Sequence, residues 1–390
     1  MKDEYTTNPQ EIITGLRKKL IRLRVGIKMA KVVYSNCNNV VLCMKTLEKL
    51  AQHRRNYAGD KIKKIVRVDG KYYWDLYIPG FPSETITNFF DGETSRTLGI
   101  EKTITRFTNI LIAITKRCPL NCEHCFEWDV LNEKETLTLP EIKSIVARFQ
   151  EKGTGIIQLT GGEPMMKMDE ILEILKSSKP GTEFWILTSG YNLTLGNARK
   201  LKNAGLTGVV VSLDHFDPNI HNLFRGSDKS FAWVQSGVKN AIDANLVTAL
   251  SICASRSFVT ESSLMTYADL AKNMGVSFIQ ILEPRAVGHY DGKDVLLDAG
   301  HEKILEAFYL KMNYRKKFRK YPIVCYHGYY QRRNGCFGSA NRSLYVDTDG
   351  DLHACPFCRI KTGSALSANL DHEIAQLEAT GCHKYAASIF

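Results

Sequence analysis

The sequence has no long apolar run. None of its hydrophobic stretches reaches the roughly 20 residues that a membrane-spanning helix needs, and its first residues lack the charged, apolar and small segments of a secretory signal. With 44% hydrophobic residues in 390, the chain still has enough apolar side chains for a sizeable core. We therefore expect a cytoplasmic protein of two to three domains, or one large barrel with additions.

Cysteine is also sparse, and its number is odd. Eleven cysteines in a chain of this length are too few for a disulfide scaffold. Most of them gather in two patches, which favours reduced thiols that bind metals. Cys37, Cys43 and Cys253 lie outside these patches, and we expect them to be buried thiols without chemistry.

The first patch is a polar loop that follows the apolar run at 110–114. It contains Cys118, Cys122 and Cys125, with the spacing C-x3-C-x2-C. Thiolates so close on one loop can converge on a single cuboidal iron–sulfur cluster, and three protein ligands for four irons leave one iron open. The spacing is not the paired C-x2-C that is usual for structural zinc, although zinc remains an alternative. The loop therefore predicts a cluster with one iron open to another ligand.

Four further motifs follow the cysteine loop in order. They are Gly161-Gly162-Glu163-Pro164, Thr188-Ser189-Gly190, Ser212-Leu213-Asp214 and His221-x3-Arg225-Gly226. With the cysteine loop, they resemble the radical S-adenosylmethionine (radical SAM) enzymes, whose signature is C-x3-C-x-φ-C. His124 stands at the φ position, which is usually aromatic.

The resemblance implies a cofactor pair and a reaction. In such enzymes the three cysteines bind a [4Fe–4S] cluster, and its open iron takes the amino and carboxylate groups of S-adenosylmethionine. An electron from a reducing partner such as flavodoxin or ferredoxin then cleaves the sulfonium. The products are methionine and a 5′-deoxyadenosyl radical, which abstracts a hydrogen atom from the substrate.

The same resemblance implies roles for the motif residues. At the methionyl part of S-adenosylmethionine, Glu163 and the Gly161-Gly162 backbone would bind the ammonium, and Ser212 and Arg225 would bind the carboxylate. At the nucleoside, the main chain of His124 would contact adenine, and Ser189 would lie at the ribose.

The charges of two of these residues suit the groups that they would hold. A carboxylate such as Glu163 can form a charge-assisted hydrogen bond with an ammonium, and Arg225 offers a carboxylate a planar two-pronged donor. Taken singly, each has an ordinary alternative, as a surface acid or an exposed ion pair. Arg285 follows the last predicted strand and is a further candidate for cofactor or substrate contact, or for an ion pair with a surface acid.

The middle of the chain alternates β-rich runs with amphipathic helical stretches, which predicts an α/β fold with a parallel sheet. Six such units form a partial (β/α)6 TIM-like barrel over 106–300. The motifs fall just after the carboxyl ends of their strands, where parallel βα folds place their active sites. The expected strands are Asn109–Thr115, Ile156–Thr160, Glu183–Thr188, Gly208–Leu213, Val247–Cys253 and Ser277–Leu282.

The second cysteine patch lies in 301–390, which we expect to form a small cysteine-rich domain. A hairpin of Leu344–Val346 and Leu352–Ala354, with its turn at Asp349-Gly350, places Cys355 at its end. The region resembles the SPASM or shortened twitch extension of radical SAM enzymes, although the second half of the SPASM pattern is absent. One auxiliary [4Fe–4S] cluster is therefore expected, and a zinc site is the alternative. The predicted ligands are Cys325, Cys336, Cys355 and Cys358, with Cys382 a substitute for Cys325 or a bystander.

The first 105 residues match none of these motifs. We expect a mainly helical stretch over Pro9–Arg55, then a hairpin of Ile65–Val68 and Tyr72–Ile78. Through Lys71 the sequence has 17 Lys and Arg against 6 Asp and Glu, an excess equal to the net charge of +11 of the whole chain. Such a basic helix suits an anionic membrane surface, an acidic peptide or nucleic acid, or it is a solvated face packed on the barrel.

We therefore expect a radical SAM oxidoreductase or maturase that modifies a peptide with the help of an auxiliary cluster. The alternative is dehydrogenation or another modification of a small molecule or lipid at a membrane surface. A non-enzymatic zinc protein that binds nucleic acid through its basic arm is the alternative of another class. The GGEP segment and Arg225 argue against it, because a structural zinc protein needs neither, so nucleic acid is not an expected partner.

Overall fold

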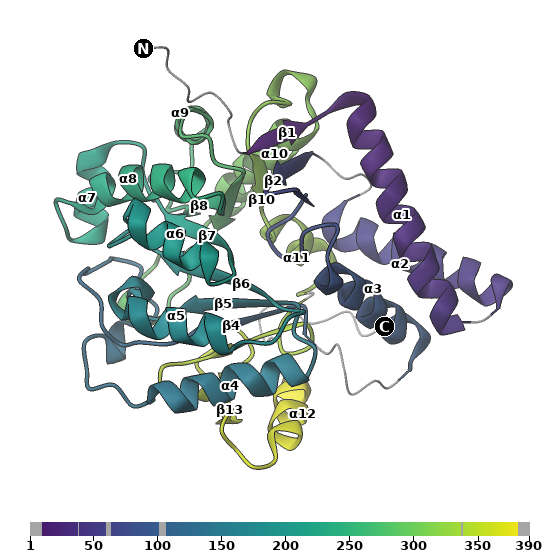
Figure 1. The fold of residues 1–390 in the computed structure, drawn as a ribbon. Coiled ribbons are helices and arrows are strands. Elements are labelled where there is room, and N and C mark those ends of the chain that lie inside the picture. Colours follow the sequence, from purple (N-terminus) through teal and green to yellow (C-terminus); the bar gives the residue numbers. More distant parts are fainter. Residues whose placement is uncertain (1–9, 38, 60–63, 101–106, 337, 381–390) are drawn as a thin grey trace, which may run out of the picture.

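The computed structural model describes residues 10–37, 39–59, 64–100, 107–336 and 338–380. Its centre is a sheet whose described strands lie in the order β10-β9-β8-β7-β6-β5-β4-β11-β12-β13. Neighbours from β10 to β11 run parallel, whereas β11, β12 and β13 pair antiparallel. Helices cover the outer face of the parallel part (Figure 1).

The six predicted strands form the middle of this sheet, which confirms the partial (β/α)6 barrel. β5 is buried along its whole length, as expected for a parallel strand covered on both faces. The strands are β4 (Asn109–Ala113), β5 (Ile156–Thr160), β6 (Glu183–Thr188), β7 (Leu206–Ser212), β8 (Val247–Cys253) and β9 (Phe278–Leu282).

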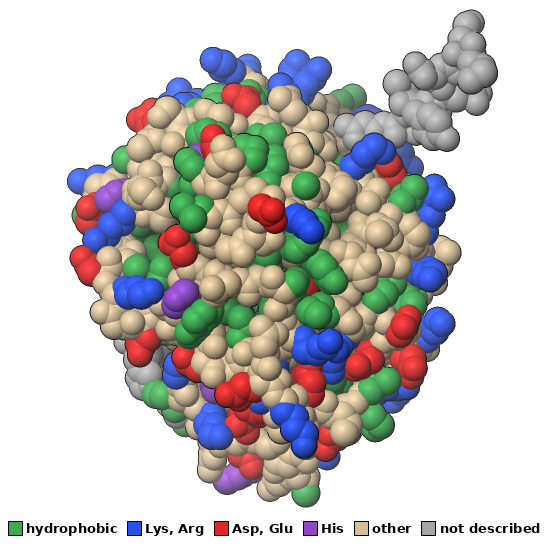
Figure 2. Space-filling view, turned by 90° about the vertical axis from the view of Figure 1, so that its left-hand side faces the viewer, with side chains coloured by type: hydrophobic (Ala, Val, Ile, Leu, Met, Phe, Trp, Pro, Cys, Tyr) green, Lys and Arg blue, Asp and Glu red, His purple; other side chains and the backbone are tan. Residues whose placement is uncertain are grey.

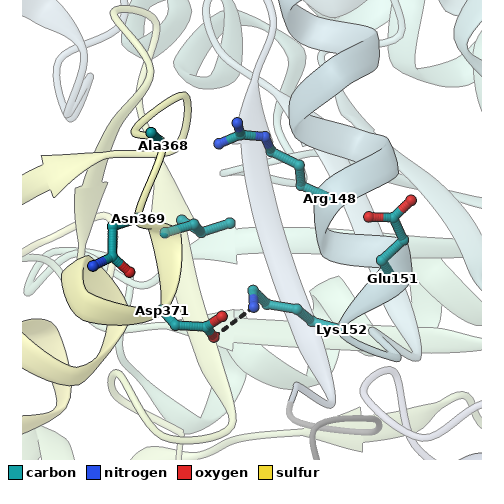
Figure 3. A pocket seen from close by; sticks show the side chains of 7 residues that line it. Arg148, Glu151, Lys152, Ala368, Asn369 and Asp371 are labelled. Atoms are coloured by element: carbon teal, nitrogen blue, oxygen red, sulfur yellow. Dashed lines mark hydrogen bonds and ion pairs between the residues drawn. The ribbon is translucent and has the colours of Figure 1, made fainter.

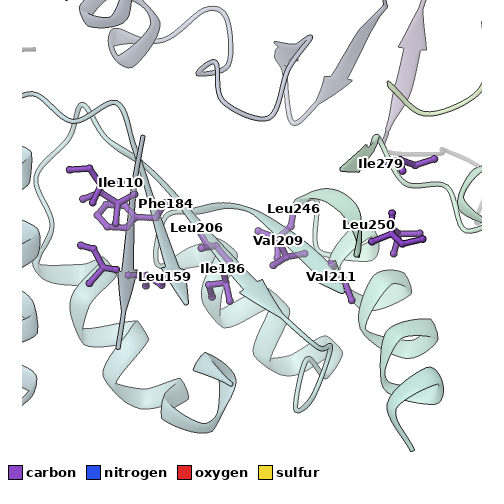
Figure 4. Packing of buried hydrophobic residues seen from close by; sticks show 14 of the residues in the cluster. Ile110, Leu159, Phe184, Ile186, Leu206, Val209, Val211, Leu246, Leu250 and Ile279 are labelled. Carbon is purple, nitrogen blue, oxygen red and sulfur yellow. The ribbon is translucent and has the colours of Figure 1, made fainter. Parts of the chain in front are cut away.

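Helices follow these strands and begin at well-formed caps. Thr138 and Glu141 form a capping box at the start of α4, and the side chains of Thr194 and Thr260 cap α6 and α9. Their apolar faces pack on buried strand residues from β4 to β9 (Figure 4). The helices are α4 (Leu139–Glu151), α5 (Met168–Ser177), α6 (Leu195–Asn203), α7 (Pro218–Arg225), α8 (Ser230–Asp243) and α9 (Glu261–Asn273), with 3-10 turns at Trp128–Val130, Pro164–Lys167, Gly288–Tyr290 and Lys316–Phe318.

Strands from the region after residue 300 extend this sheet at both edges. β10 (Ile323–Cys325) pairs parallel with β9, and β11 (Ser343–Val346) pairs parallel with β4. The predicted hairpin is present as β11 and β12 (Asp351–His353), and β13 (Lys361–Ser364) completes the sheet. The sheet therefore runs across residue 300, the predicted end of the barrel.

Three helices of the same region lie outside the sheet. α10 (Ala299–Tyr314) leads to β10, and α11 (Gly328–Asn334) lies in the segment between β10 and β11. α12 (Leu370–Thr380) lies beside α4 (Figure 1). A polar cavity of about 400 Å³ separates α4 from the start of α12, and the ion pair of Lys152 with Asp371 crosses it (Figure 3).

The mainly helical stretch predicted over Pro9–Arg55 is present, but it is divided into two helices and preceded by a short strand. The structure has a strand, β1 (Glu11–Ile13), and two helices, α1 (Gly15–Cys37) and α2 (Val40–Ala58). The chain starts a new helix at α2 because the side chain of Asn39 accepts a hydrogen bond from the backbone N–H of Leu42. No helix in the described part of the chain is long and apolar enough to cross a membrane.

The predicted hairpin that follows is present, with a shorter second strand. β2 (Ile65–Val68) pairs with both β1 and β3 (Lys71–Tyr73), and α3 (Glu84–Leu98) comes next. Val66, Val68 and Tyr73 pack against the first residues of the barrel strands. Among these are Ile156, Trp185, Val247, Phe278 and Ile323. The N-terminal strands therefore close the barrel at the amino ends of its strands, opposite the cysteine loop.

Candidate functional site

The cysteine loop leaves the carboxyl end of β4. Cys122 is buried, Cys118 and Cys125 are half-buried, and all three are free thiols. Asn132 fixes Cys118, because its Oδ1 accepts from the Cys118 N–H (2.9 Å) and its Nδ2 donates to the Cys118 carbonyl (3.1 Å). Burial raises the pKa of the Cys118 and Cys125 thiols to about 12. A bound metal would reverse this effect, since it stabilises the thiolate.

The two glycines of the GGEP segment allow β5 to end against this loop. The Gly162 N–H donates to the Thr115 carbonyl (2.7 Å). A Cβ on Gly162 would overlap the Arg117 carbonyl, and one on Gly161 would overlap that of Thr115. Only glycine permits this approach, so the pair positions Glu163 next to the strand that leads to Cys118.

Glu163 is a buried carboxylate with an unbalanced charge. It accepts hydrogen bonds from the Thr188 hydroxyl (2.7 Å) and from both the N–H (2.8 Å) and the hydroxyl (2.6 Å) of Ser189. Burial raises its pKa. Among the described residues, no Lys, Arg or His forms an ion pair with it. An ammonium group would supply the missing positive charge.

Arg225 has a partner of its own. Its Nε and Nη2 both lie 2.6 Å from Oδ2 of Asp214, and its Nη1 lies 3.6 Å from the Cys122 sulfur. Burial alone would raise the pKa of Asp214, but the Arg225 guanidinium offsets this and lowers it below its usual range. The Ser212-Leu213-Asp214 motif made Asp214 a further candidate of the same class as Arg285, but nothing in the sequence indicated its pairing with Arg225.

The remaining predicted nucleoside and carboxylate residues lie around the same loop. Ser212 is half-buried at the end of β7, beside Ser251 of β8. The His124 ring stacks on Phe224, and its buried Nδ1 has no hydrogen-bond partner. Burial lowers the pKa of His124 to about 4, which keeps the ring neutral. The Ser189 hydroxyl bonds to Glu163 and so connects the two motifs.

The segment after β9 covers the cysteine loop. The His289 N–H donates to the Cys125 carbonyl (2.9 Å), and its ring stacks on Trp128 with centroids 3.8 Å apart. Arg285, the residue predicted in this segment, forms an ion pair with Glu283 (3.5 Å), whose side chain is buried and is not the surface acid that the alternative expected. Sequence reasoning missed His289, because only the fold brings residue 289 onto residue 125.

The structure brings only part of the second set of cysteines close together. Cys355 and Cys358 share one turn after β12, and the Ala340 N–H donates to the carbonyl next to Cys355, which brings the segment after Cys336 alongside. Cys325 is buried at the end of β10. Cys382 lies outside the described residues. No three Cys, His, Asp or Glu side chains in the described ranges come together as a site for one metal ion.

Residues of the C-terminal hairpin hold the cysteine loop in place. The Tyr345 hydroxyl donates to Glu127 (2.6 Å), two residues after Cys125. Lys116 forms an ion pair with Asp349 at the hairpin turn (2.7 Å). These contacts join the two cysteine-bearing segments, and the sequence alone did not indicate them.

Comparison with known proteins fits this arrangement. A family model described as the Radical SAM superfamily matches residues 112–256, which include the cysteine loop and all four further motifs. The chain contains a radical SAM domain. This confirms the expected enzyme and its two cofactors, a [4Fe–4S] cluster and S-adenosylmethionine.

The names of two curated relatives of this radical SAM protein refer to reactions of small molecules. The GTP 3′,8-cyclase of Photorhabdus laumondii is 29% identical over 65% of this chain and 80% of its own. The AdoMet-dependent heme synthase of Methanosarcina barkeri is 26% identical over 64% of this chain and 77% of its own.

Solved structures show the same fold. Streptococcus suis SuiB bound to precursor peptide SuiA superposes with a TM-score of 0.56 at 13% identity, over 73% of this chain and 69% of SuiB. The structure described as native anSMEcpe with bound AdoMet gives a TM-score of 0.54 at 17% identity, over 71% of this chain and 82% of anSMEcpe.

Proposed function

We propose that this radical SAM enzyme abstracts a hydrogen atom from a peptide and modifies it, with an auxiliary cluster in its C-terminal region. The observation that carries the proposal is the placement of three free thiols on one loop at the carboxyl end of β4, next to Arg225 and the GGEP segment. Radical SAM chemistry needs three cysteine ligands and one iron left open.

The residues around the loop suit S-adenosylmethionine. Glu163 is buried without a counter-charge, which the methionyl ammonium would supply. Ser212 and Arg225 would face the methionyl carboxylate, and Arg225 keeps Nη1 next to Cys122 while Asp214 holds its other two nitrogens. His124 would meet the adenine through its main chain, and Ser189 would lie at the ribose.

The auxiliary cluster would use the second set of cysteines. Cys336, Cys355 and Cys358 lie in neighbouring segments, and Cys325 or Cys382 would complete the set. The hydrogen bond of Tyr345 with Glu127 connects this region to the first loop. An iron–sulfur cluster here can relay an electron or bind substrate, whereas zinc would only brace the fold.

Peptide modification is supported by the nature of the structural neighbours, since SuiB was solved with a precursor peptide and anSMEcpe with a peptide. A small molecule or lipid is the second candidate, because the curated relatives include a GTP 3′,8-cyclase and a heme synthase. We infer in either case that flavodoxin or ferredoxin supplies the electron in the cytoplasm.

A deuterium-transfer assay separates these candidates. The reduced enzyme, reconstituted without oxygen, is incubated with S-adenosylmethionine and an extract of cells grown in heavy water. Deuterium in 5′-deoxyadenosine reports hydrogen abstraction from a compound in the extract. If the substrate is a peptide, pretreatment of the extract with protease abolishes the transfer. Transfer that survives protease and follows the small-molecule or lipid fraction contradicts the peptide proposal.

A further inference from the structure

Helix α1 has two apolar faces, and only one of them packs against other residues in the part of the chain that the structure describes. Ile21, Val25 and Val32 are buried against Ile86 and Phe90 of α3. A second set recurs at intervals of three, four or seven along the opposite side, and its members are 48–72% exposed. They are Leu16, Leu20, Leu23, Ile27 and Tyr34.

The apolar surface continues onto the next helix. Nine of the sixteen large hydrophobic side chains that are exposed in the described part of the chain lie between Leu16 and Met44. Four of them lie among the first five residues of α2 and point in several directions, because three of them are consecutive rather than spaced along one face. These are Val40, Val41, Leu42 and Met44, exposed by 42–66%.

This surface is also strongly cationic. No Asp or Glu occurs between Glu11 and Glu48, whereas eight Lys and Arg do. On the side of the molecule formed by α7 and α8, by contrast, positive and negative side chains are mixed (Figure 2). α1 lies at the outer edge of the molecule, at the right of Figure 1. We call the exposed side of α1 and the start of α2 the α1 ridge. The cations of this stretch, of which Arg17 forms an ion pair with Glu11 (2.6 Å), are Arg17, Lys18, Lys19, Arg22, Arg24, Lys28, Lys31 and Lys45.

We propose that the α1 ridge docks on an anionic lipid bilayer. The helix would lie in the plane of the interface, with its apolar side at the boundary of the acyl chains and its cations among the phosphate headgroups. The first turn of α2 would insert at the end of the ridge, since a bilayer can surround an apolar tip on all sides. This inference concerns where the enzyme works and does not depend on which substrate it modifies.

Two other occupants fit the ridge less well. A second copy of the chain would bring two cationic flanks together, and like charges at the edges of paired helices oppose association. The groove of an acidic protein would bind one apolar face of a helix. It would leave uncovered part of the apolar side chains at the start of α2.

Vesicle sedimentation with the full-length protein tests the proposal. We expect it to bind phosphatidylcholine vesicles that contain 30% phosphatidylglycerol, to bind pure phosphatidylcholine much more weakly, and to dissociate when NaCl rises from 0.1 to 0.5 M. Neutralising three cations together, in K19Q/R22Q/K31Q, should weaken binding by roughly a hundredfold, since each cation near the surface contributes a factor of about 5. L20Q/L23Q should also weaken binding.

Matched controls and a depth probe complete the test. L310Q/K200Q removes an exposed apolar side chain and a cation elsewhere and should bind like the parent, and circular dichroism checks that each variant is folded. A tryptophan introduced by L23W should be quenched by lipids brominated on their acyl chains. The proposal is overturned if anionic vesicles are not bound, if ridge variants bind like the parent, or if the tryptophan is not quenched. Self-association in solution that L20Q/L23Q abolishes, without vesicle binding, would assign the ridge to a second copy.

Discussion

At the scale of single residues, the site depends on buried charges with defined partners. Arg225 contacts both Asp214 and the sulfur of Cys122, and Glu163 connects two motifs that lie 25 residues apart. The motifs were evident in the sequence. The pairing of Arg225 with Asp214 was not, because it depends on how α7 returns to the end of β7.

From the buried ion pair of Asp214 with Arg225 we predict an effect on the free energy of unfolding. Asp214→Asn leaves the Arg225 guanidinium buried without a counter-charge, which should lower the free energy of unfolding by about 3–5 kcal/mol. Removing both charges in Asp214→Asn/Arg225→Met should cost less than the sum of the single changes. Urea unfolding of the metal-free protein measures this, and additive effects would show that the pair is not coupled.

The buried amino group of Lys64 leads us to predict how the free energy of unfolding depends on pH. Its amino group is buried and donates to the carbonyls of Tyr321 (2.8 Å) and Pro322 (3.1 Å), and burial lowers its pKa from 10.5 to about 7. Between pH 7 and 10.5 the unfolded chain therefore binds more protons than the folded protein, so Lys64 makes the stability rise with pH. Below pH 7 both states are protonated, and this contribution no longer changes.

Urea unfolding at pH 7.5, 8.5 and 9.5 checks this sign. Relative to Lys64→Met, the parent protein should gain up to about 1.4 kcal/mol per pH unit over this range. Lys176→Met, on the exposed side of α5, is the control and should keep the slope of the parent. Equal slopes for the parent and Lys64→Met would refute the argument.

At the scale of elements, the barrel strands and both hairpins were predictable, whereas β1, β10 and β13 and the pairing of β10 and β11 with the barrel were not. β4 to β9 appear in the sequence as apolar runs followed by polar motifs, and the structure confirms all six. β10 and β11 have three and four residues, and their partners are β9 and β4. Such pairings are set by the tertiary structure, since a short strand has no periodicity to reveal it. The break between α1 and α2 depends on the cap at Asn39.

Because β10 and β11 pair with the outer strands of the barrel, we expect the C-terminal region to be necessary for the barrel to fold. Deletion of residues 301–390 removes β10 and β11 and exposes the backbone edges of β9 and β4. We expect the truncated protein to be insoluble or unfolded when expressed, as judged by solubility and near-ultraviolet circular dichroism. A soluble, cooperatively unfolding fragment 1–300 would show instead that the barrel is an independent domain.

The auxiliary cluster is tested at the turn after β12. Because Cys355 is not one of the three thiols of the first loop, Cys355→Ala should leave uncoupled formation of 5′-deoxyadenosine near the parent level but abolish modification of the substrate. The iron content should fall by about four atoms per chain. If this variant converts substrate at the rate of the parent, the second cysteine set has no role in the reaction.

At the scale of the whole molecule, the N-terminal region closes one end of the barrel and the cysteine loop lies at the other. Val66, Val68 and Tyr73 fill the barrel at the amino ends of its strands. This leaves the carboxyl ends, where Trp128 stacks on His289, as the side from which we expect the substrate to enter. The sequence indicated a basic N-terminal helix. It could not show which of its two apolar faces is buried, because both have helical spacing.

The central claim is that Cys118, Cys122 and Cys125 hold the cluster that cleaves S-adenosylmethionine, and Cys122→Ala tests it most directly. The measurement is the yield of 5′-deoxyadenosine from anaerobically reconstituted, reduced protein, with iron and sulfide counted in the same sample. The account predicts no product and a loss of about four irons in this variant, and parent values in Cys43→Ala, which removes a buried thiol of α2. Cys122→Ala protein that keeps its iron and still forms 5′-deoxyadenosine would contradict the account.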